Sequence, residues 1–312
     1  MAHNPPALLF LTEVRLAQLG ARLLATNIVI GYAHAMRIEF LKMQGLGNDF
    51  FVFDAPAAAG AFFDPITVRA LADRHTGVGF DQALMLESPR SPDSRTYYRV
   101  FNSDGGEVEQ CGNGARCIAA LLFARAPERG RSVKMESKGG IVNARVLEDG
   151  RVSVDMGAPD FAPRSIPFDA AAEAPSYSLT IRGEAVEFGA VSMGNPHAVL
   201  RVADVTTAPV ARLGPSIENH PRFPRRANVG FMQVVDPGHI ALRVFERGAG
   251  ETLACGTGAC AAAAVGRRQG ILSADVRVDL PGGSAQVSWP GPGEHVWLTG
   301  PAKTVFTGTV DI

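Results

Sequence analysis

The sequence predicts an α+β (mixed α/β) fold made of two similar halves, and three observations support this. Short apolar runs rich in β-branched and aromatic residues outnumber helical patterns, which is typical of largely antiparallel sheets. A 19-residue segment occurs twice, 144 residues apart and without a gap. The chain also has 312 residues, more than the ~250–300 residues at which a single core stops growing.

Strands are expected wherever a short apolar run lies between turn signals. The expected strands are Met36–Met43, Phe50–Phe53, Ala83–Leu86, Tyr97–Phe101, Ser132–Glu136, Ile141–Leu147, Val152–Met156, Tyr177–Ile181, Val186–Val191, Ala198–Val202, Val229–Val235, Ile240–Phe245, Val276–Leu280, Ala285–Ser288 and Val296–Leu298. Asp149-Gly150 predicts a hairpin between two of them, Ile141–Leu147 and Val152–Met156.

Helices are expected at four places. Ile66–Arg74 and Pro209–Ile217 have helical patterns, and two glycine-initiated helices follow Cys111 and Cys255, ending near residues 124 and 269. The segment Asp160–Ser176 is rich in proline and alanine, so we expect a long loop or an interdomain connection there.

Residues 1–35 differ from the rest of the chain and are expected to lie outside the fold. They contain Pro5-Pro6, a short apolar run and scattered arginines, whereas the strand pattern begins at a second methionine, Met36. A secretory signal peptide is disfavoured because no basic region precedes the apolar run and Glu13 and Arg15 interrupt the segment that follows it. A start codon placed too far upstream is our preferred interpretation, and a transit-type amphipathic peptide is the alternative.

The composition is that of an ordinary globular protein. Hydrophobic residues make up 46% and charged residues 20% of the chain, which argues against disorder. Thirty basic and 31 acidic residues leave a net charge of −1, which disfavours nucleic acid as a partner. No apolar run approaches the ~18 residues of a membrane span. Four cysteines do not make a disulfide scaffold in a chain of this length, so we expect a reduced, cytoplasmic setting.

The repeated segment carries the strongest functional signal. Residues 99–117 read RVFNSDGGEVEQCGNGARC, residues 243–261 read RVFERGAGETLACGTGACA, and 9 of these 19 positions are identical. A second echo, Gly47-Asn48 against Gly194-Asn195, lies earlier in each half. One long repeat used twice predicts a duplicated domain with two pseudo-symmetric lobes rather than a solenoid.

Each copy of the repeat contains a Cys-Gly-X-Gly motif. The pattern around it predicts a strand and a glycine-rich turn before the motif and an alanine-rich helix after it. Cys111 and Cys255 thus stand at helix N-termini, where free N–H groups and the helix dipole favour a thiolate and can bind a carboxylate. The turns lack the GxGxxG and Walker patterns, so a nucleotide is disfavoured. The spacing to Cys117 and Cys260 does not match CxxC, so a metal site is disfavoured too.

Two equivalent thiols on opposite lobes suit the inversion of a stereocentre. This reaction needs a base on one face and an acid on the other, and the roles exchange in reverse. A thiol pKa of ~8.5 can be tuned so that one sulfur is a thiolate while the other keeps its proton. The helix N-termini would hold the α-carboxylate as the Cα–H bond breaks. We therefore expect a two-base racemase or epimerase, which requires no cofactor.

Simpler interpretations exist for the individual residues. Cys117 and Cys260 lie inside the expected helices and are interpreted as core residues. Asn48, Asn195 and Asn228 lie in turn contexts, where asparagine commonly adopts a left-handed backbone or caps a helix.

His197 also has two interpretations. It is either the partner of a nucleophilic cysteine or a surface residue at the start of a strand. A single nucleophilic cysteine leaves unexplained why the motif occurs in both halves.

From Met36 to the C-terminus the sequence resembles diaminopimelate epimerase. The resemblance rests on MQGLGNDF (43–50), GFDQ (79–82), FNSDGGEVEQCGNGARC (101–117), MGNPH (193–197), RRANVGF (225–231) and FERGAGETLACGTGACA (245–261). It implies interconversion of LL- and meso-2,6-diaminopimelate without a cofactor, for lysine and peptidoglycan precursor synthesis. It also implies that each lobe is a mostly antiparallel strand barrel around a central helix, with the active site between the lobes.

The resemblance also assigns roles to single residues. Cys111 becomes the proton acceptor and Cys255 the donor in the forward direction, and reversal exchanges these labels. His197 and Glu246 are expected beside the cysteines, where they would tune the thiol pKa values. The residues expected to bind substrate are Asn48, Gln82, Asn102, Gly112, Asn113, Asn195, Asn228, Glu246, Arg247, Gly256 and Thr257. An arginine can hold the distal carboxylate in bidentate fashion, while neutral amides satisfy the other polar groups.

We further expect an extension (1–35), an N-terminal lobe (36–158 with 300–312) and a C-terminal lobe (159–299). The expected partners are the small-molecule substrate and, from the resemblance, a second copy of the chain, with no metal, nucleic acid or membrane. The rival enzymes are proline and hydroxyproline racemases, which share the paired-cysteine logic. A non-catalytic carboxylate-binding protein is another alternative, as is a redox switch in which Cys111 and Cys255 form a disulfide.

Overall fold

The computed structural model describes residues 37–55 and 63–312 and confirms an α+β fold dominated by strands. The first half contains β1 (Arg37–Gly45), β2 (Asn48–Asp54), α2 (Pro65–Ala72), β3 (Gln82–Glu87), β4 (Tyr97–Asn102), β5 (Glu107–Val108), α3 (Gly112–Arg125), a 3₁₀ turn (Pro127–Arg129), β6 (Ser132–Ser137), β7 (Gly140–Val146) and β8 (Val152–Asp155). The second half contains β9 (Tyr177–Ile181), β10 (Glu184–Ser192), β11 (Pro196–Arg201), α4 (Val210–Glu218), β12 (Asn228–Asp236), β13 (His239–Glu246), β14 (Gly250–Thr252), α5 (Gly256–Arg268), β15 (Asp275–Leu280), β16 (Gly283–Ser288) and β17 (Trp297–Gly300). The last strand is β18 (Lys303–Asp311). Among the helices of these ranges, none is long and apolar enough to cross a membrane.

The two halves repeat the same strand connections. β2 pairs in parallel with β3, β3 antiparallel with β4, and β4 antiparallel with β5 and parallel with β6. The strands β11 to β15 repeat these pairings in the same order and sense. The registers also coincide, because Val100 faces Val108 in the first half and Val244 faces Thr252 in the second. The sequence repeat is therefore a structural repeat.

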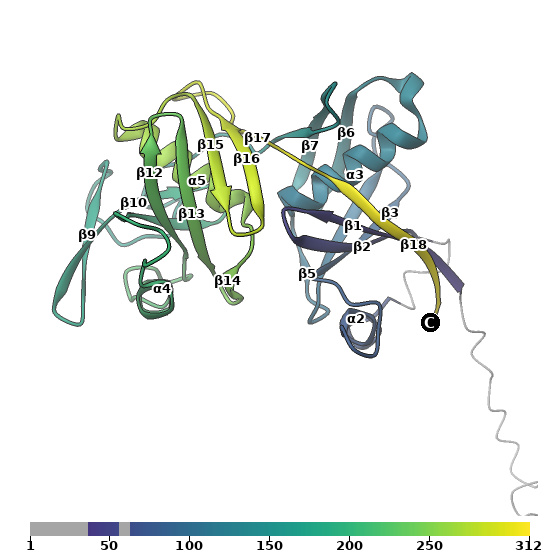
Figure 1. Cartoon of the computed structure of the whole chain (residues 1–312), viewed down its shortest axis with the longest axis horizontal. Coiled ribbons are helices and arrows are strands. Elements are labelled where there is room, and N and C mark those ends of the chain that lie inside the picture. The colour runs from purple at the N-terminus through teal and green to yellow at the C-terminus, as the bar shows by residue number, and fades with distance from the viewer. Residues whose placement is uncertain (1–36, 56–62) are drawn as a thin grey trace, which may run out of the picture. The chain divides into compact units, whose positions relative to one another are not determined.

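Each half wraps its strands around one helix (Figure 1). In the first half, α3 contributes Ala115, Cys117 and Ile118 to a core shared with strands β1 to β8. In the second half, α5 contributes the run Ala259–Val265 to a core shared with β10 to β17. The small alanine side chains let the surrounding strands approach the helix closely. A further core packs α4 against β9 to β12.

The central helices start at the cysteines and end for identifiable reasons. Cys111 and Cys255 both have extended backbones and cap α3 and α5 with their side chains. α3 ends just before Pro127, which disfavours a helical conformation in the residue before it. α5 ends before Gly270, whose φ of 74° turns the chain away.

Two strands from the end of the chain extend the sheet of the first half. β17 pairs antiparallel with β8, with Trp297 opposite Asp155 and Gly300 opposite Val152. β18 then pairs with β1, which it follows closely in Figure 1. The first half therefore contains strands from both ends of the described chain.

Most expected elements are present, and the missed ones have physical causes. All four helices are found with their ends shifted by one or two residues, and the Asp149-Gly150 hairpin joins β7 to β8. β5 and β14 are only two and three residues long, too short to show a pattern. β18 was missed because its residues are mostly exposed and therefore lack an apolar face. The extension 1–35 and Met36 lie outside the described residues.

The proline- and alanine-rich segment Asp160–Ser176 has no helix or extended strand, as expected for a long loop. It nevertheless packs on the second half. Ile166 and Phe168 are buried in the core around α4, and Asp160 forms an isolated bridge with Ser192.

Candidate active site

Cys111 lies where α3 begins. Its Sγ accepts a hydrogen bond from the backbone N–H of Gly114 at 3.5 Å and lies 3.8 Å from Oδ1 of Asn48. A carbonyl oxygen can only accept, so the thiol donates its proton to Asn48. Asn48 is the first residue of β2, and the start of this strand thus places an amide against the sulfur.

Cys255 repeats this arrangement at the start of α5. Its Sγ accepts from the backbone N–H of Gly258 at 3.3 Å and lies 3.6 Å from Oγ1 of Thr257. A Cβ on Gly258 would lie 3.2 Å from the same sulfur and 3.0 Å from Val244, so glycine provides the room for this approach.

The N-terminal ends of α3 and α5 approach each other. The amide Nδ2 of Asn113 in α3 donates to the backbone oxygen of Ala254, which precedes the second cysteine, at 3.4 Å. A Cβ on Gly112 or Gly256 would lie 3.6 or 3.0 Å from the same atom, Cδ2 of Leu298. The two Cys-Gly motifs therefore pack against the same side chain, Leu298, and glycine at both positions leaves room for it.

Burial raises the pKa of both thiols above its usual value. At Cys111 desolvation outweighs the lowering by the backbone N–H groups of Gly114 and Asn113, and at Cys255 the pKa is raised further. The helix N-termini thus lower the thiol pKa values, as expected, but burial has the larger effect. Both sulfurs accordingly hold their protons at neutral pH.

Glu246 is the acidic residue shared by the two cysteines. Its negative charge raises the pKa of Cys111 and of Cys255. Glu246 ends β13 and accepts a hydrogen bond from the hydroxyl of Thr252 in β14. The hairpin of the repeat therefore fixes a negative charge that acts on both thiols.

His197 is a buried, neutral histidine in β11. It is 1% exposed, so the interpretation as a surface residue is wrong. Burial, reinforced by the charge of Arg247, lowers the pKa of His197 to about 3. Its Nε2 bonds to Oδ1 of Asn195 at 2.9 Å, and Nδ2 of Asn195 donates to Thr257 at 3.4 Å. Because Thr257 also lies beside the sulfur of Cys255, this series of hydrogen bonds connects His197 indirectly to Cys255.

The asparagines of the two halves lie at strand starts without left-handed backbones. Asn48 and Asn228 begin β2 and β12, and Asn195 immediately precedes β11. The left-handed positions are taken by the neighbouring Gly47 and Gly194, with φ of 79° and 85°. The interpretation of these asparagines as left-handed turn residues is therefore wrong, and their side chains instead hydrogen-bond to neighbouring strands and loops.

Asn228 connects two elements of the second half. Its Nδ2 donates to the backbone oxygen of Pro196 at 3.1 Å, and its Oδ1 accepts from the backbone N–H of Arg247 at 2.9 Å. The exposed guanidinium of Arg247 uses Nη1 to contact the backbone oxygen of Arg225 at 3.2 Å. Its other N–H groups point to no partner within the described chain, which suits capture of a carboxylate.

Gln82 and Asn102 lie opposite each other on β3 and β4. Gln82 Nε2 donates to Asn102 Oδ1 at 2.8 Å, which leaves Gln82 Oε1 as an acceptor. This oxygen is buried and has no hydrogen-bond partner in the part of the chain that the structure describes. A buried acceptor without a partner is unfavourable, so Gln82 is suited to receive an N–H of a ligand.

Sequence reasoning overlooked two residues that support this site. Asp81 accepts a hydrogen bond from Nδ2 of Asn48 at 2.9 Å, and Arg116 donates to Oδ1 of Asn113 at 2.8 Å. Arg116 is completely buried, which is rare for an arginine. The available signal was its place in the first repeat, where a charged residue stands in an otherwise apolar helix.

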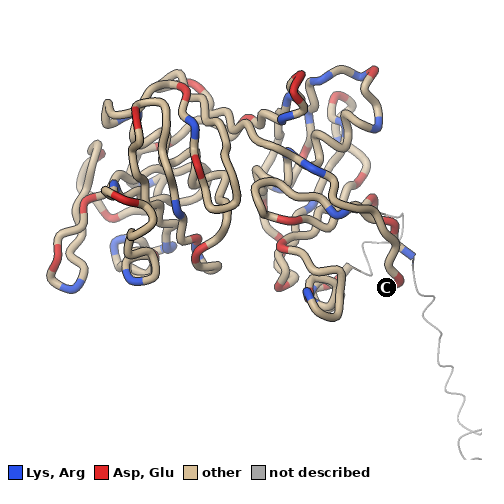
Figure 2. The backbone as a smooth tube through the Cα atoms, in the orientation of Figure 1, with Lys and Arg blue, Asp and Glu red and all other residues tan. Residues whose placement is uncertain are grey.

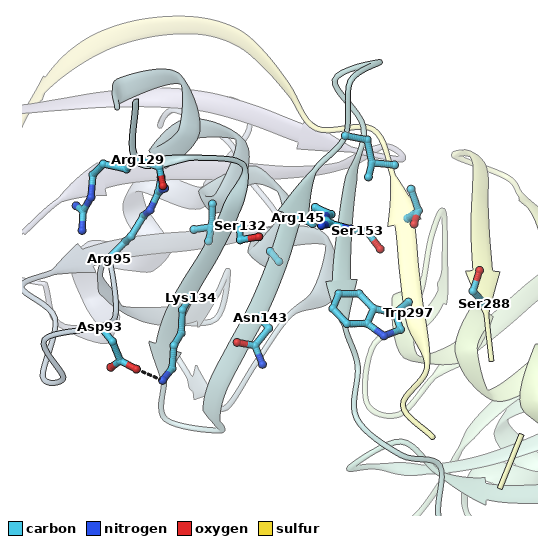
Figure 3. A pocket seen from close by; sticks show the side chains of 14 residues that line it. Asp93, Arg95, Arg129, Ser132, Lys134, Asn143, Arg145, Ser153, Ser288 and Trp297 are labelled. Carbon is cyan, nitrogen blue, oxygen red and sulfur yellow. Dashed lines mark hydrogen bonds and ion pairs between the residues drawn. The ribbon is translucent and has the colours of Figure 1, made fainter. Parts of the chain in front are cut away.

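A cavity is lined by residues other than the cysteines (Figure 3). It has a volume of about 720 Å³ and is lined by Asp93, Arg95, Arg129, Ser132, Val133, Lys134, Asn143, Ala144, Arg145, Leu147, Ser153, Ser288, Trp297 and Thr299. Its lining contains neither cysteine and none of the residues expected to bind substrate. The candidate active site is thus defined by hydrogen bonds around the thiols rather than by this groove.

Acidic and basic residues are interspersed along both halves (Figure 2). Among residues 37–55 and 63–312, no three histidine, cysteine or acidic side chains converge in the way that a metal ion requires. All four cysteines are free thiols, and Cys117 and Cys260 are buried core residues, as expected.

The chain is similar to known proteins along nearly all of the described length. A family model described as diaminopimelate epimerase matches residues 40–162 and 189–305. The diaminopimelate epimerase of Pseudomonas paraeruginosa is 55% identical over 275 residues, covering 88% of this chain and 99% of that protein. That of Thioalkalivibrio sulfidiphilus is 57% identical over 279 residues, covering 89% and 100%. A solved hydroxyproline epimerase from Agrobacterium vitis covers 90% of this chain and 94% of its own, with a TM-score of 0.65 and 15% identity, a likeness of fold alone.

Proposed function

The chain belongs to the diaminopimelate epimerase family, and from this premise we propose that it interconverts LL- and meso-2,6-diaminopimelate without a cofactor. The observation that carries the proposal is the pair of helix-capping cysteines, one from each half, with Glu246 acting on both thiols. A reaction that used one nucleophilic cysteine would give the second no role.

The proposed reaction moves two protons. In the direction by convention called forward, the thiolate of Cys111 takes the α-proton from one face of the substrate, forming an S–H bond and leaving a carbanion. The thiol of Cys255 then gives its proton to the opposite face and becomes a thiolate. The Cα–H bond is broken and remade with inverted configuration, and no electrons are gained or lost. The reverse reaction exchanges the two roles.

Formation of the thiolate is coupled to substrate binding in this proposal. Both thiol pKa values are raised by burial and by the charge of Glu246. The ammonium group of the substrate would offset that negative charge and so lower both pKa values. The backbone N–H groups of Gly114 and Gly258 already point at the sulfurs and would stabilise each thiolate in turn.

Substrate recognition is proposed to use the neutral side chains around the thiols. The α-carboxylate would lie against the helix N-termini, at Gly112-Asn113 and Gly256-Thr257. The distal carboxylate would be held by the exposed guanidinium of Arg247, and an ammonium N–H by the unpartnered oxygen of Gln82. The remaining proposed contacts are Asn48, Asn102, Asn195 and Asn228. His197 would act on Cys255 through its neighbours.

We also propose a setting and an assembly. The product would serve lysine and peptidoglycan precursor synthesis in the cytoplasm, where thiols stay reduced. A homodimer is supported by Val305 and Phe306, which expose 58% and 48% of their surfaces on β18. We assign 36–158 with 300–312 to one lobe and 159–299 to the other, because β18 pairs with β1.

Incubation of the reduced protein with LL-diaminopimelate in heavy water tests the proposal. We expect α-proton exchange coupled to formation of the meso isomer, with no added cofactor. Turnover of proline or hydroxyproline instead would reassign the substrate. No exchange with any amino acid would contradict an epimerase, and activity that required oxidised cysteines would favour the redox switch.

A further inference from the structure

A continuous chain of hydrogen bonds runs from the edge of the first half to the interior of α3. Arg74 Nη2 donates to Asp81 Oδ1 at 2.7 Å, and Asp81 Oδ2 accepts from Asn48 Nδ2 at 2.9 Å. Asn48 Oδ1 accepts from Asn113 Nδ2 at 3.3 Å, and Asn113 Oδ1 accepts from Arg116 Nη2 at 2.8 Å. Two asparagine amides therefore lie between a carboxylate and a guanidinium.

The ends of this chain fix the direction of its amides. A carboxylate only accepts hydrogen bonds, so Asn48 turns its NH₂ group toward Asp81. A guanidinium only donates, so Asn113 turns its oxygen toward Arg116. Both constraints agree at the central bond, where the NH₂ of Asn113 meets the oxygen of Asn48. Rotation of either amide by 180° would place like groups against each other at both of its ends.

The fixed direction determines what each amide presents to the reacting region. Asn48 presents an oxygen to Cys111, with Sγ and Oδ1 at 3.8 Å. Asn113 presents its NH₂ group to the backbone oxygen of Ala254 in the second half, at 3.4 Å. This series of hydrogen bonds thus determines which atom faces the Cys111 thiol. It also determines the hydrogen bond to Ala254, next to Cys255.

Arg116 is unfavourable for stability alone. It is 0% exposed, and no acidic side chain forms an ion pair with it among the residues described. Its Nη1 is a buried donor without a partner, and its Nε reaches only the backbone oxygen of Pro301 at 3.4 Å. An apolar side chain of similar volume would avoid the cost of burying an unpaired charge. A role in the site accounts for a cation at this position.

We propose that Arg116 and Asp81 are positioning residues that together hold the amides of Asn113 and Asn48, so that an oxygen acceptor always faces the Cys111 thiol. The expected change in kcat rests on the proposed epimerase function. The expected change in the pKa of Cys111 does not rest on it, because this pKa can be measured without substrate.

Several groups other than Asn48 also act on the Cys111 thiol, and they set the expected direction of each change. They are the backbone N–H groups of Gly114 and Asn113 and the charges of Glu246 and Arg116, and the charge of Cys111 in turn raises the pKa of Tyr98. The charges of Cys117 and Cys260 also act on the guanidinium of Arg116.

Two substitutions should shift the Cys111 pKa in opposite directions. Arg116→Met removes a positive charge that lowers the pKa of Cys111, so this pKa should rise. Asp81→Asn replaces a carboxylate, which only accepts, by an amide that can also donate, so the direction of Asn48 is no longer fixed at this end. Its NH₂ can then turn to the sulfur and favour the thiolate, at the expense of the hydrogen bond from Asn113. The pKa of Cys111 should therefore fall in this variant.

The test is alkylation by iodoacetamide as a function of pH, with the extent at Cys111 and Cys255 read separately by peptide mass spectrometry. We expect the Cys111 midpoint to rise by about one pH unit in Arg116→Met and to fall by about one unit in Asp81→Asn. Arg116→Lys keeps the charge and should shift the midpoint less. The Cys255 midpoint should stay in place in all three variants. Epimerisation kcat should fall about 10- to 100-fold in Arg116→Met.

Arg95→Met is the matched control. Arg95 also serves α3, but at its far end, where it donates to the backbone oxygens of Leu122, Arg129 and Gly130. Its loss should lower the thermal midpoint of unfolding and leave the Cys111 alkylation profile unchanged. A purely structural role of Arg116 would give the same pattern as this control.

Three results would overturn the inference. They are an unchanged Cys111 midpoint in folded Arg116→Met, shifts in the same direction in Arg116→Met and Asp81→Asn, and equal shifts of both cysteines. If Arg116→Met does not fold, Arg116→Lys and Asp81→Asn decide by the same readout. A wild-type protein that fails to epimerise diaminopimelate would refute the proposed function, yet the alkylation test would still give its answer.

Discussion

Cys111 and Cys255 accept the same hydrogen bond in the two halves, from the backbone N–H of the glycine three residues later, at 3.5 and 3.3 Å. Their side-chain neighbours differ. The amide of Asn48 faces the first sulfur, whereas the hydroxyl of Thr257 faces the second, whose pKa is also raised by the charge of Glu246. The pseudo-symmetry is therefore a property of the backbone, while each thiol has its own chemical surroundings.

Cys111→Ala and Cys255→Ala should each abolish epimerisation, because each removes the proton carrier on one face of the substrate. Turnover of LL-diaminopimelate is the measurement, and circular dichroism checks that the fold is retained. Cys117→Ala, which changes a buried core thiol, is the control and should retain activity. Full activity in either of the first two variants would disprove the two-base assignment.

Glu246→Gln should lower the pKa of both thiols, since the carboxylate charge raises both in the native protein. The alkylation midpoints of the two cysteines should move to lower pH together, while epimerisation falls about 10²- to 10⁴-fold. Glu251→Gln changes an acidic residue in the same hairpin that pairs with Arg243. It should leave both midpoints in place, and an equal effect of the two variants would contradict a specific role for Glu246.

His197 should make the protein less stable at acidic pH. The unfolded chain binds a proton at this histidine near its usual pKa of 6.5, whereas the folded protein does so only at about 3. Since the unfolded state binds more protons between these values, the free energy of unfolding falls as pH is lowered through this window, by as much as ~4–5 kcal/mol.

Urea unfolding from pH 7 to pH 4 measures this dependence. His197→Gln should flatten it, whereas His75→Gln at an exposed histidine should not. An unchanged slope in His197→Gln would show that other groups cause the acid sensitivity.

Gly189→Ala should destabilise the second half. A Cβ at this position of β10 would lie 2.3 Å from Cγ1 of Val265 in α5, so the strand and helix must separate. We expect the free energy of unfolding to fall by about 1–3 kcal/mol. Gly238→Ala, where the nearest atom is at 3.5 Å, should have little effect. Adding Val265→Ala should restore part of the loss, and failure to do so would place the strain elsewhere.

Deletion of residues 1–35 should leave epimerisation unchanged, because every residue assigned to the site lies beyond Met36. The measurement is kcat/KM of the shortened chain beside the full-length protein. A large loss would show that the extension contributes to the fold or to a dimer.

The repeat explains why sequence reasoning located both cysteines. Because residues 99–117 and 243–261 match without a gap, Cys111 and Cys255 occupy equivalent backbone positions. The interpretation of one cysteine as a proton carrier therefore applied to the other as well. Local patterns also predicted α3 and α5, since their apolar faces and glycine starts are encoded within each helix. The exposed strand β18 has no such local pattern, and only its partner β1, from the other end of the chain, defines it.

Burial could not be predicted for the polar residues of the site. His197 looked like a surface residue beside a proline, and it is buried because β11 lies between β10 and β12. Arg116 looked like one charged position in a helix, and it is enclosed because Pro301 and Gly300 from the end of the chain lie against it. Such environments are made by tertiary contacts between distant segments, which no short pattern contains.

The pairing of β18 with β1 also has a consequence for synthesis of the protein. Domains generally fold as the ribosome produces them, N-terminal part first, at about 5–20 residues per second. Here the earliest described strand, β1, pairs with β2 at one edge but receives the partner at its other edge, Lys303–Asp311, only when translation is almost finished. The nascent N-terminal half therefore waits with an open strand edge, which favours chaperone binding and makes a premature stop codon near the end of the gene unusually harmful.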